Sequence, residues 1–237
     1  MNERGTRRGW RAAAGSLGLT MVLLSGCQNI QDSTPAQTMV RVIDASYNAP
    51  PLGITVGQTA IAANIAGATI TNYAFLGPGP STAYIYPPKS KTPSASATGQ
   101  FLASQEHSVY ITDSGAGYTA TVLTDQATAP PTGDISVRFL QQAIATGSVD
   151  IYFVPSGDTL SEAKPILTDL TVGSITDYIN ISTGTYSVVI TPTGVATATY
   201  TGPSIQFSAG QVRTMLIMDS QLTTNPPVNI VVGDDLN

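Results

Sequence analysis

The chain has 237 residues, of which 42% are apolar and 11% are charged, with one cysteine and one histidine. Charged residues are less than half as frequent as in an average soluble protein, so the surface must be rich in serine, threonine, asparagine and glutamine, as in many secreted β proteins. This composition excludes a basic nucleic-acid binder and a charge-driven disordered chain. It also excludes a disulfide framework, a thiolate zinc cluster and a multi-histidine metal centre, and we expect no metal and no cofactor.

Residues 1–26 have the composition of an export signal peptide. An uncharged run over residues 12–24 follows four arginines, which are Arg4, Arg7, Arg8 and Arg11. This order is that of a basic n-region and an apolar h-region. The run is 13 residues long, whereas a membrane-spanning helix needs about 20. We therefore predict export, by the general or the twin-arginine route, rather than a stable membrane span.

The end of this segment carries a more specific motif. Leu24, Ser25, Gly26 and Cys27 resemble the lipobox of bacterial lipoproteins, in which an apolar residue and two small residues precede the cysteine at which a signal peptidase cuts. The resemblance implies that Cys27 becomes the first mature residue and carries a thioether-linked lipid and acyl chains such as palmitate, enough for stable anchoring. Gln28 replaces the aspartate that retains enteric lipoproteins at the inner membrane, which favours the outer membrane. The alternative is a plain secretory signal with an unmodified cysteine.

The mature chain is acidic. Without residues 1–26 it has six basic and fourteen acidic residues, a net charge of −8. Anionic headgroups and nucleic acid repel such a body. We therefore expect no nucleic-acid partner, and contact with a membrane only through the lipid on Cys27.

The rest of the mature chain is predicted to form short β-strands. Residues 27–38 are polar and predict a flexible tether. Short runs rich in Val, Ile, Thr and Tyr follow, separated by Gly, Pro, Asn and Asp, and they predict strands. In chain order they cover residues 40–43, 52–56, 82–86, 108–112, 120–123, 135–140, 149–154, 185–191, 204–207, 212–218 and 228–232. Only residues 159–163 suggest a helical turn.

An internal repeat divides this region. The sequence VRV at residue 40 recurs as VRF at residue 137, ITNY at residue 70 as ITDY at residue 175, and FLASQ at residue 101 as FSAGQ at residue 207. The offset grows because the middle loops differ in length. We predict an all-β protein with two tandem immunoglobulin-like β-sandwich domains, over residues 39–124 and 134–237, joined by a Pro-rich linker over residues 125–133.

The repeat resembles a bacterial and archaeal surface family, domain of unknown function 4397. The resemblance rests on the opening VRVIDASYNAPPLGI at residue 40, on VGSITDY at residue 172 and on GTYSV at residue 184. The family usually has a histidine where this chain has Asp44 and Gln141, which puts any role of that imidazole in doubt. The resemblance implies tandem β-sandwich domains outside the cytoplasm, and it implies no activity.

Candidate catalytic residues are few. His107 aligns with Arg213 of the second repeat, and a buried catalytic base could not be exchanged for an arginine, whose guanidinium stays protonated. We therefore predict that His107 lies at the solvent-exposed rim of the sandwich. No Gly-x-Ser-x-Gly elbow occurs in the chain. The sequence predicts a protein that is not an enzyme, with a hydrolase as the last-ranked alternative.

Two equivalent pairs of residues could bind a ligand. Arg41 and Arg138 could bind an anion, but we favour charges on a sheet surface paired across strands. Tyr73 and Tyr178 could stack on sugars, but we favour packing at corners of the sandwich. The pair at residues 234–235 could contact calcium, although no Asp-x-Asp-x-Asp-Gly loop is present.

These observations favour a non-catalytic cell-envelope lipoprotein. Its tandem sandwiches would serve protein interaction or structural spacing, facing the periplasm or the cell surface. The alternative is a carbohydrate-binding or adhesive module. The partner would accordingly be an envelope protein or a glycan, and the oligomeric state stays open.

Overall fold

The computed structural model describes residues 36–47, 50–115, 117–221 and 225–236. The predicted signal peptide, Leu24, Ser25, Gly26 and Cys27 lie outside the described residues. Within the described part of the chain, no helix is long and apolar enough to cross a membrane.

The first half of the described chain forms nine strands. They are β1 (Thr38–Asp44), β2 (Leu52–Val56), β3 (Thr59–Ile65), β4 (Thr69–Ile70), β5 (Ala74–Leu76), β6 (Gly79–Tyr86), β7 (Ala95–Phe101), β8 (Glu106–Ser114) and β9 (Gly117–Asp125). The second half forms β10 (Asp134–Gln142), β11 (Val149–Pro155), β12 (Leu167–Leu170), β13 (Ile179–Ser182), β14 (Gly184–Pro192), β15 (Tyr200–Phe207), β16 (Val212–Asp219) and β17 (Val228–Asp234). The all-β prediction is confirmed.

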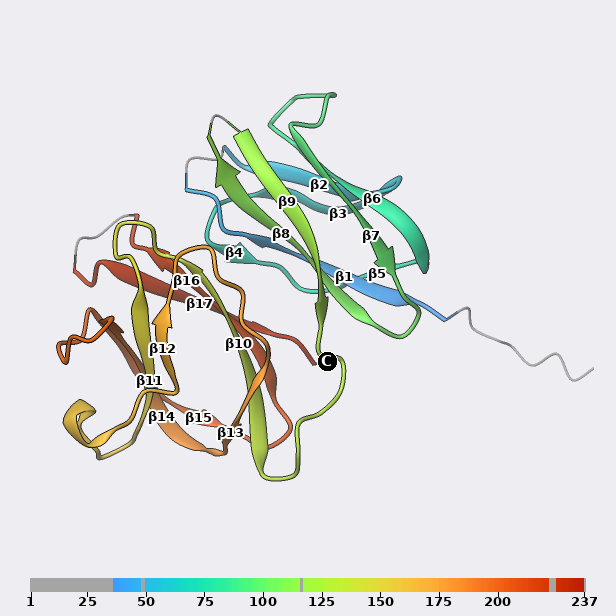
Figure 1. The fold of residues 1–237 in the computed structure, drawn as a ribbon. Helices are drawn as coiled ribbons and strands as arrows, with labels where there is room; N and C mark the ends of the chain where they lie inside the picture. The colour runs from blue at the N-terminus through green and yellow to red at the C-terminus, as the bar shows by residue number, and fades with distance from the viewer. Residues whose placement is uncertain (1–35, 48–49, 116, 222–224, 237) are drawn as a thin grey trace, which may run out of the picture. The chain divides into compact units, whose positions relative to one another are not determined.

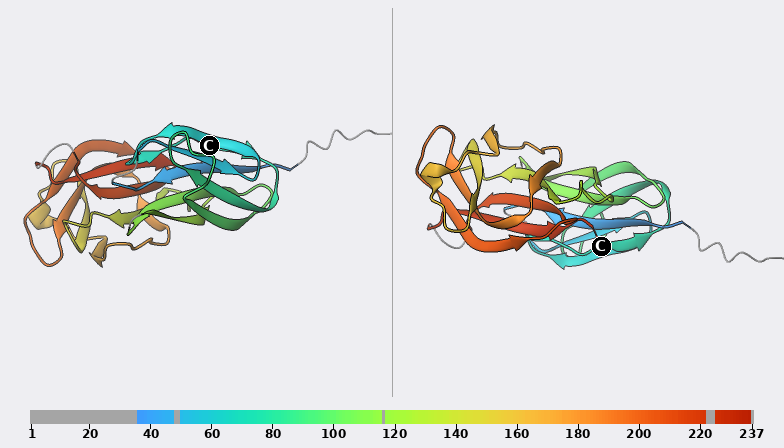
Figure 2. Two further views of the ribbon diagram at one scale, coloured as in Figure 1. Left: turned by 90° about the horizontal axis from the view of Figure 1, so that it is seen from above. Right: turned by 90° about the horizontal axis from the view of Figure 1, so that it is seen from below.

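The strands form two sandwiches with the same strand order (Figure 1). In the first, sheet A has the order β4-β1-β8-β9, with β5 also on β1, and sheet B has the order β3-β2-β6-β7. In the second, sheet C has the order β13-β10-β16-β17 and sheet D the order β12-β11-β14-β15. β1 pairs in parallel with β8, and β10 pairs in parallel with β16. Figure 2 shows the blue to green strands in one sandwich and the yellow to red strands in the other.

Burial separates the sheets into an inner and an outer pair. Sheets B and D bury one face, so a strand such as β2 alternates between buried and half-buried residues. The central strands of sheets A and C are buried along most of their length. One apolar cluster lies between sheets A and B and a second between C and D. A third joins the two halves and comprises Ile43, Ala45, Tyr110, Leu140, Leu216 and Met218.

The sequence located the central strands better than the edges. All eleven predicted segments lie within strands, and the suggested helical turn is the 3-10 helix Leu160–Glu162. Strands β3, β4, β5, β7, β12 and β13 were not predicted. Most are short, and the longer two, β3 and β7, lie at the edges of sheet B with many exposed residues. The apolar alternation that marks a strand in sequence is therefore weak there.

Candidate functional site

The two equivalent arginines lie inside the protein, where each half supplies the ion partner of the other. Arg41 of β1 is fully buried, and its Nη2 lies 2.6 Å from Oδ1 of Asp235, just after β17. Arg138 of β10 is 3% exposed, and its Nη2 lies 2.6 Å from Oδ1 of Asp125, the last residue of β9. We call these four side chains the exchange cluster, because the two carboxylates are exchanged between the halves.

Hydroxyl groups complete the exchange cluster in nearly the same way on both sides. Nε of Arg41 donates to Ser108 Oγ at 2.9 Å, and that hydroxyl donates to Asp125 at 2.6 Å. Nε of Arg138 lies 3.2 Å from Thr214 Oγ1, and that hydroxyl donates to Asp235. Buried charges of this kind are tolerated only when their polar atoms find partners, and here they do.

The equivalent tyrosines cover the exchange cluster. Tyr73 donates from its hydroxyl to Asp125 at 2.7 Å, and Tyr178 donates to Asp235 at 2.6 Å. Each ring also lies against an arginine, with guanidinium-to-centroid distances of 4.7 Å at Arg41 and 4.8 Å at Arg138. Burial raises the pKa of both tyrosine hydroxyls, and the nearby carboxylates raise it further. The tyrosines therefore stay protonated as hydrogen-bond donors.

This geometry corrects the prediction that the arginines lie on a sheet surface. They are indeed paired, but they are buried, and the nearer carboxylate of each comes from the opposite half. The aspartate of the same half lies farther away, at 3.7 Å from Arg41 and 4.0 Å from Arg138. Burial by itself lowers the pKa of Arg41, whereas Asp235 and Asp125 raise it, with a net rise above its ordinary value. Because both guanidiniums are saturated by protein partners, the exchange cluster holds the halves together and offers no free cation to an external anion.

The aspartate pair near the C-terminus has separated roles. The carboxylate of Asp235 accepts hydrogen bonds from Arg41, Thr214 and Tyr178. Asp234 is exposed and lies 3.1 Å from Arg213 Nε. Among the residues that the structure describes, no group of three or more His, Cys, Asp or Glu side chains could hold a metal ion.

The prediction that His107 lies at the rim is wrong. Its side chain is 1% exposed, its Nε2 accepts a hydrogen bond from the Leu102 backbone at 3.2 Å, and its ring packs edge-on against Phe101. Burial lowers its pKa, which favours the neutral imidazole. The equivalent Arg213 lies over Phe207 in the same way but is partly exposed. The predicted direction of the His107 side chain, on the face of Val109 and Ile111, is therefore correct, whereas its predicted exposure is wrong.

The positions of the family's histidine serve local backbone structure. Oδ1 of Asp44 accepts a hydrogen bond from the Ser46 amide at 3.0 Å, and Oε1 of Gln141 accepts one from the Ala143 amide at 2.8 Å. Both side chains are buried. Each therefore closes a turn two residues further along the chain.

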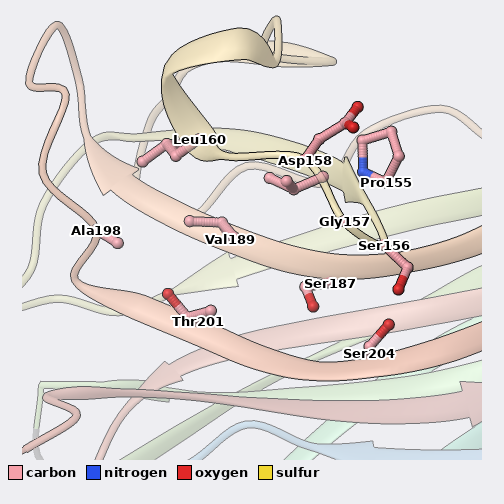
Figure 3. A pocket seen from close by; sticks show the side chains of 11 residues that line it. Pro155, Ser156, Gly157, Asp158, Leu160, Ser187, Val189, Ala198, Thr201 and Ser204 are labelled. Carbon is pink, nitrogen blue, oxygen red and sulfur yellow. The ribbon is translucent and has the colours of Figure 1, made fainter.

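A concavity lies on the outer face of sheet D, where residues 155–163 arch over β14 and β15 (Figure 3). The cavity has a volume of about 330 Å³. Its floor is formed by Val154 and Val189, which are only 6% and 3% exposed although they lie on the outer face. Around the floor lie four hydroxyl side chains, Ser156, Ser187, Thr201 and Ser204. We call this concavity the hydroxyl pocket.

The sequence reasoning missed the hydroxyl pocket, although a signal for it was present. In the first half, Val56 and Thr59 are paired across a two-residue hairpin. In the second half, β11 ends at Pro155 and β12 begins only at Leu167. This longer connection is one source of the growing offset between the repeats, and it supplies the roof of the pocket.

One family model matches part of the chain. The family described as "Domain of unknown function (DUF4397)" matches residues 38–152, just under half of the chain. No curated protein matches the chain significantly.

Several solved structures match the chain at low identity and low TM-score. The Bacillus anthracis TIE protein is 9% identical with a TM-score of 0.23, and the match covers 76% of this chain and 33% of that protein, so the chain spans a third of its length. CBMbc (family CBM26) of Eubacterium rectale Amy13K, solved with maltoheptaose, is 8% identical with a TM-score of 0.26, covering 82% and 96%. A protein of Bacteroides ovatus, provisionally assigned to cell adhesion, is 11% identical with a TM-score of 0.27, covering 85% and 99%. Such TM-scores are too low to transfer a role.

Proposed function

We propose that this protein is a non-catalytic cell-envelope lipoprotein, anchored through Cys27 and facing the periplasm or the cell surface. Tandem copies of the DUF4397 sandwich form its body, which serves protein interaction or structural spacing. The anchor rests on the lipobox of Leu24, Ser25, Gly26 and Cys27, and the residue after it favours the outer membrane. The body's net charge of −8 leaves the lipid as the attachment to an anionic bilayer.

The exchange cluster is the observation that supports the proposed role of the two sandwiches in protein interaction or spacing. Two reciprocal ion pairs, with the apolar cluster around Ile43 and Leu216 beside them, join the sandwiches over buried surface. Separating the halves would break both 2.6 Å ion pairs and leave each arginine only the longer contact to the carboxylate of its own half, at 3.7 Å for Arg41 and 4.0 Å for Arg138, which is unfavourable for buried charges. Such a joint holds two domains in one orientation, as a spacer or a platform for a partner requires.

The same burial supports a role without catalysis. His107 is the chain's one imidazole, and it is enclosed beside Phe101. The carboxylates of Asp125 and Asp235 are engaged by arginine and tyrosine. A general base needs a free face toward a substrate, and none of these groups has one.

The anchor is tested by labelling cells with a palmitate analogue. The wild type should be labelled and should sediment with membranes after a high-salt wash. Cys27→Ser should lose the label and appear in the soluble fraction, whereas the control Thr34→Ser in the tether should behave like the wild type. A Cys27→Ser protein that stays membrane-bound after the wash would overturn the lipoprotein proposal.

A carbohydrate-binding role is the second candidate function. The observation in its favour is the hydroxyl pocket, which combines an aliphatic floor with side chains that both donate and accept hydrogen bonds.

A further inference from the structure

The hydroxyl groups of the hydroxyl pocket have no protein partners. The side chains of Ser156, Ser187, Thr201 and Ser204 make no hydrogen bond within the described part of the chain, although they come from a loop and two strands that meet at one cavity. Ser187 and Ser204 lie directly opposite each other in the β14–β15 register. Figure 3 shows both on the same side of the sheet, beneath the loop.

The matching place in the first half is built differently. Thr82 and Thr98 lie opposite each other in the β6–β7 register, as Ser187 and Ser204 do in the second half. Their hydroxyls lie 2.9 Å apart and bond to each other. The tight hairpin between β2 and β3 provides no roof above them. The second half alone, among the described residues, therefore combines a covered floor with free hydroxyls at this position.

The lining of the hydroxyl pocket selects for a neutral ligand. Among the described residues, Asp158 is the only charged one that lines it, and Figure 3 shows its carboxylate pointing away from β14 and β15. An anionic ligand would meet no cation there, and desolvation of its charge would be uncompensated. Hydroxyl side chains suit a ligand that is rich in hydroxyls itself, while Val154 and Val189 can pack against the C–H face of a sugar ring.

The size of the hydroxyl pocket limits the length of the ligand. A volume of about 330 Å³ corresponds to about ten water molecules. This is enough for one sugar unit or two. A longer chain would have to leave the cavity along the open side of the sheet.

We propose that the hydroxyl pocket of the second half binds one or two units of a neutral saccharide, with one site per chain. This rests on the second candidate function. Ser187 and Ser204 hydrogen-bond to the sugar hydroxyls, Val154 and Val189 contact the ring, and Leu160 in the arching loop covers it.

The test uses the lipidated chain in a detergent without a sugar headgroup. An array of neutral glucan, mannan, galactan and xylan oligosaccharides is probed beside uronate-containing and sulfated counterparts, and the best binder is titrated by calorimetry. We expect neutral saccharides to bind with a stoichiometry of one. Ser187→Val with Ser204→Val should weaken binding at least tenfold. The matched control, Thr82→Val with Thr98→Val at the equivalent cross-strand pair, should leave binding unchanged.

A second variant covers the case in which the serine pair fails to fold, as judged by circular dichroism. Replacing residues 156–165 by the Gly-Gln dipeptide of the β2–β3 hairpin removes the roof and should abolish binding. Failure of every neutral saccharide to bind, preference for acidic glycans, equal effects of the two cross-strand pairs, or a stoichiometry of two would each overturn the proposal. Any of these results would leave the lipoprotein and spacer role standing, because membrane fractionation of Cys27→Ser decides that role separately.

Discussion

At the scale of single residues, the exchange cluster shows when buried charge can be kept. Removing a guanidinium and a carboxylate from water costs several kcal/mol per ion, and attraction offsets this only when the remaining polar atoms are also satisfied. Here Ser108 and Thr214 bridge arginine to carboxylate, and Tyr73 and Tyr178 fill further positions on the carboxylates. The cluster therefore depends on all its members, because losing one leaves a buried charge without a partner.

We predict that Arg138→Met destabilises the protein by about 3–5 kcal/mol, because Asp125 keeps its hydroxyl donors but loses the cation that touches it. Denaturant unfolding measures the effect. The control is Arg213→Met, whose ion pair with Asp234 is partly exposed. That substitution should cost no more than about 1 kcal/mol. Equal losses in the two variants would show that the exchange cluster is not a buried ion network.

Sequence reasoning recognised Arg41 and Arg138 as equivalent and paired, yet it could not name their partners. The sequence places Asp125 at the start of the linker, and it offers Asp235 only as a possible calcium contact. Asp125 is the last residue of β9 and Asp235 directly follows β17, so each aspartate lies at the end of the last strand of its half. The repeat makes this symmetry visible in the sequence. The pairing of each arginine with the aspartate of the other half could not be predicted, because a repeat predicts contacts within each copy and says nothing of how two copies pack.

At the scale of the strand, β8 is buried on both faces, whereas the sequence predicts only one buried face. Alternation turns His107, Val109 and Ile111 toward sheet B, and Ser108 and Tyr110 toward the other half. The sequence predicted the first face but treated the second as solvent. Glu106 shares the face of Ser108 by the same alternation and is only 3% exposed. Its Oε2 has no hydrogen-bond partner.

This placement makes Glu106 a source of pH-dependent instability. Burial raises its pKa to about 7, Asp125 and Asp235 raise it as well, and Arg41 lowers it. Between about pH 4.3 and pH 7, the native state therefore holds a proton on Glu106 that the unfolded chain, with a pKa near 4.3, has released. Stability contributed by the protonated carboxyl is complete below the unfolded pKa and is lost as the pH rises to about 7.

We predict that Glu106→Val, which installs the residue found at the equivalent Val212, stabilises the protein progressively more between about pH 4.5 and pH 7. Above pH 7 the gain over the wild type should stay constant. Denaturant melts of both proteins across this range measure the difference, which cancels contributions from His107 and Asp44. A gain that does not change with pH would mean that Glu106 keeps an ordinary pKa in the folded protein.

At the scale of the whole molecule, two sandwiches share buried surface in addition to their own cores. The apolar residues between sheets A and C and the exchange cluster come from both halves. Tyr47 of the first half adds a polar contact, because its hydroxyl donates to the Gln142 carbonyl and accepts from the Asp219 amide. The connection over residues 126–133 is largely exposed, so cleavage there would break the chain without touching these contacts.

We predict that the protein stays in one piece after this connection is cut. A protease site placed within residues 127–132 should yield two fragments in denaturing gels that co-elute at the size of the intact chain in gel filtration. The halves should then separate once Arg138→Met is introduced into the cut protein, because cleavage removes the high effective concentration that the linker provides. The uncut Arg138→Met protein, still tethered, is the control and should elute as one species. Wild-type fragments that elute separately would show that the interface is too weak to hold the two sandwiches in one orientation, and the spacer role would fall with it.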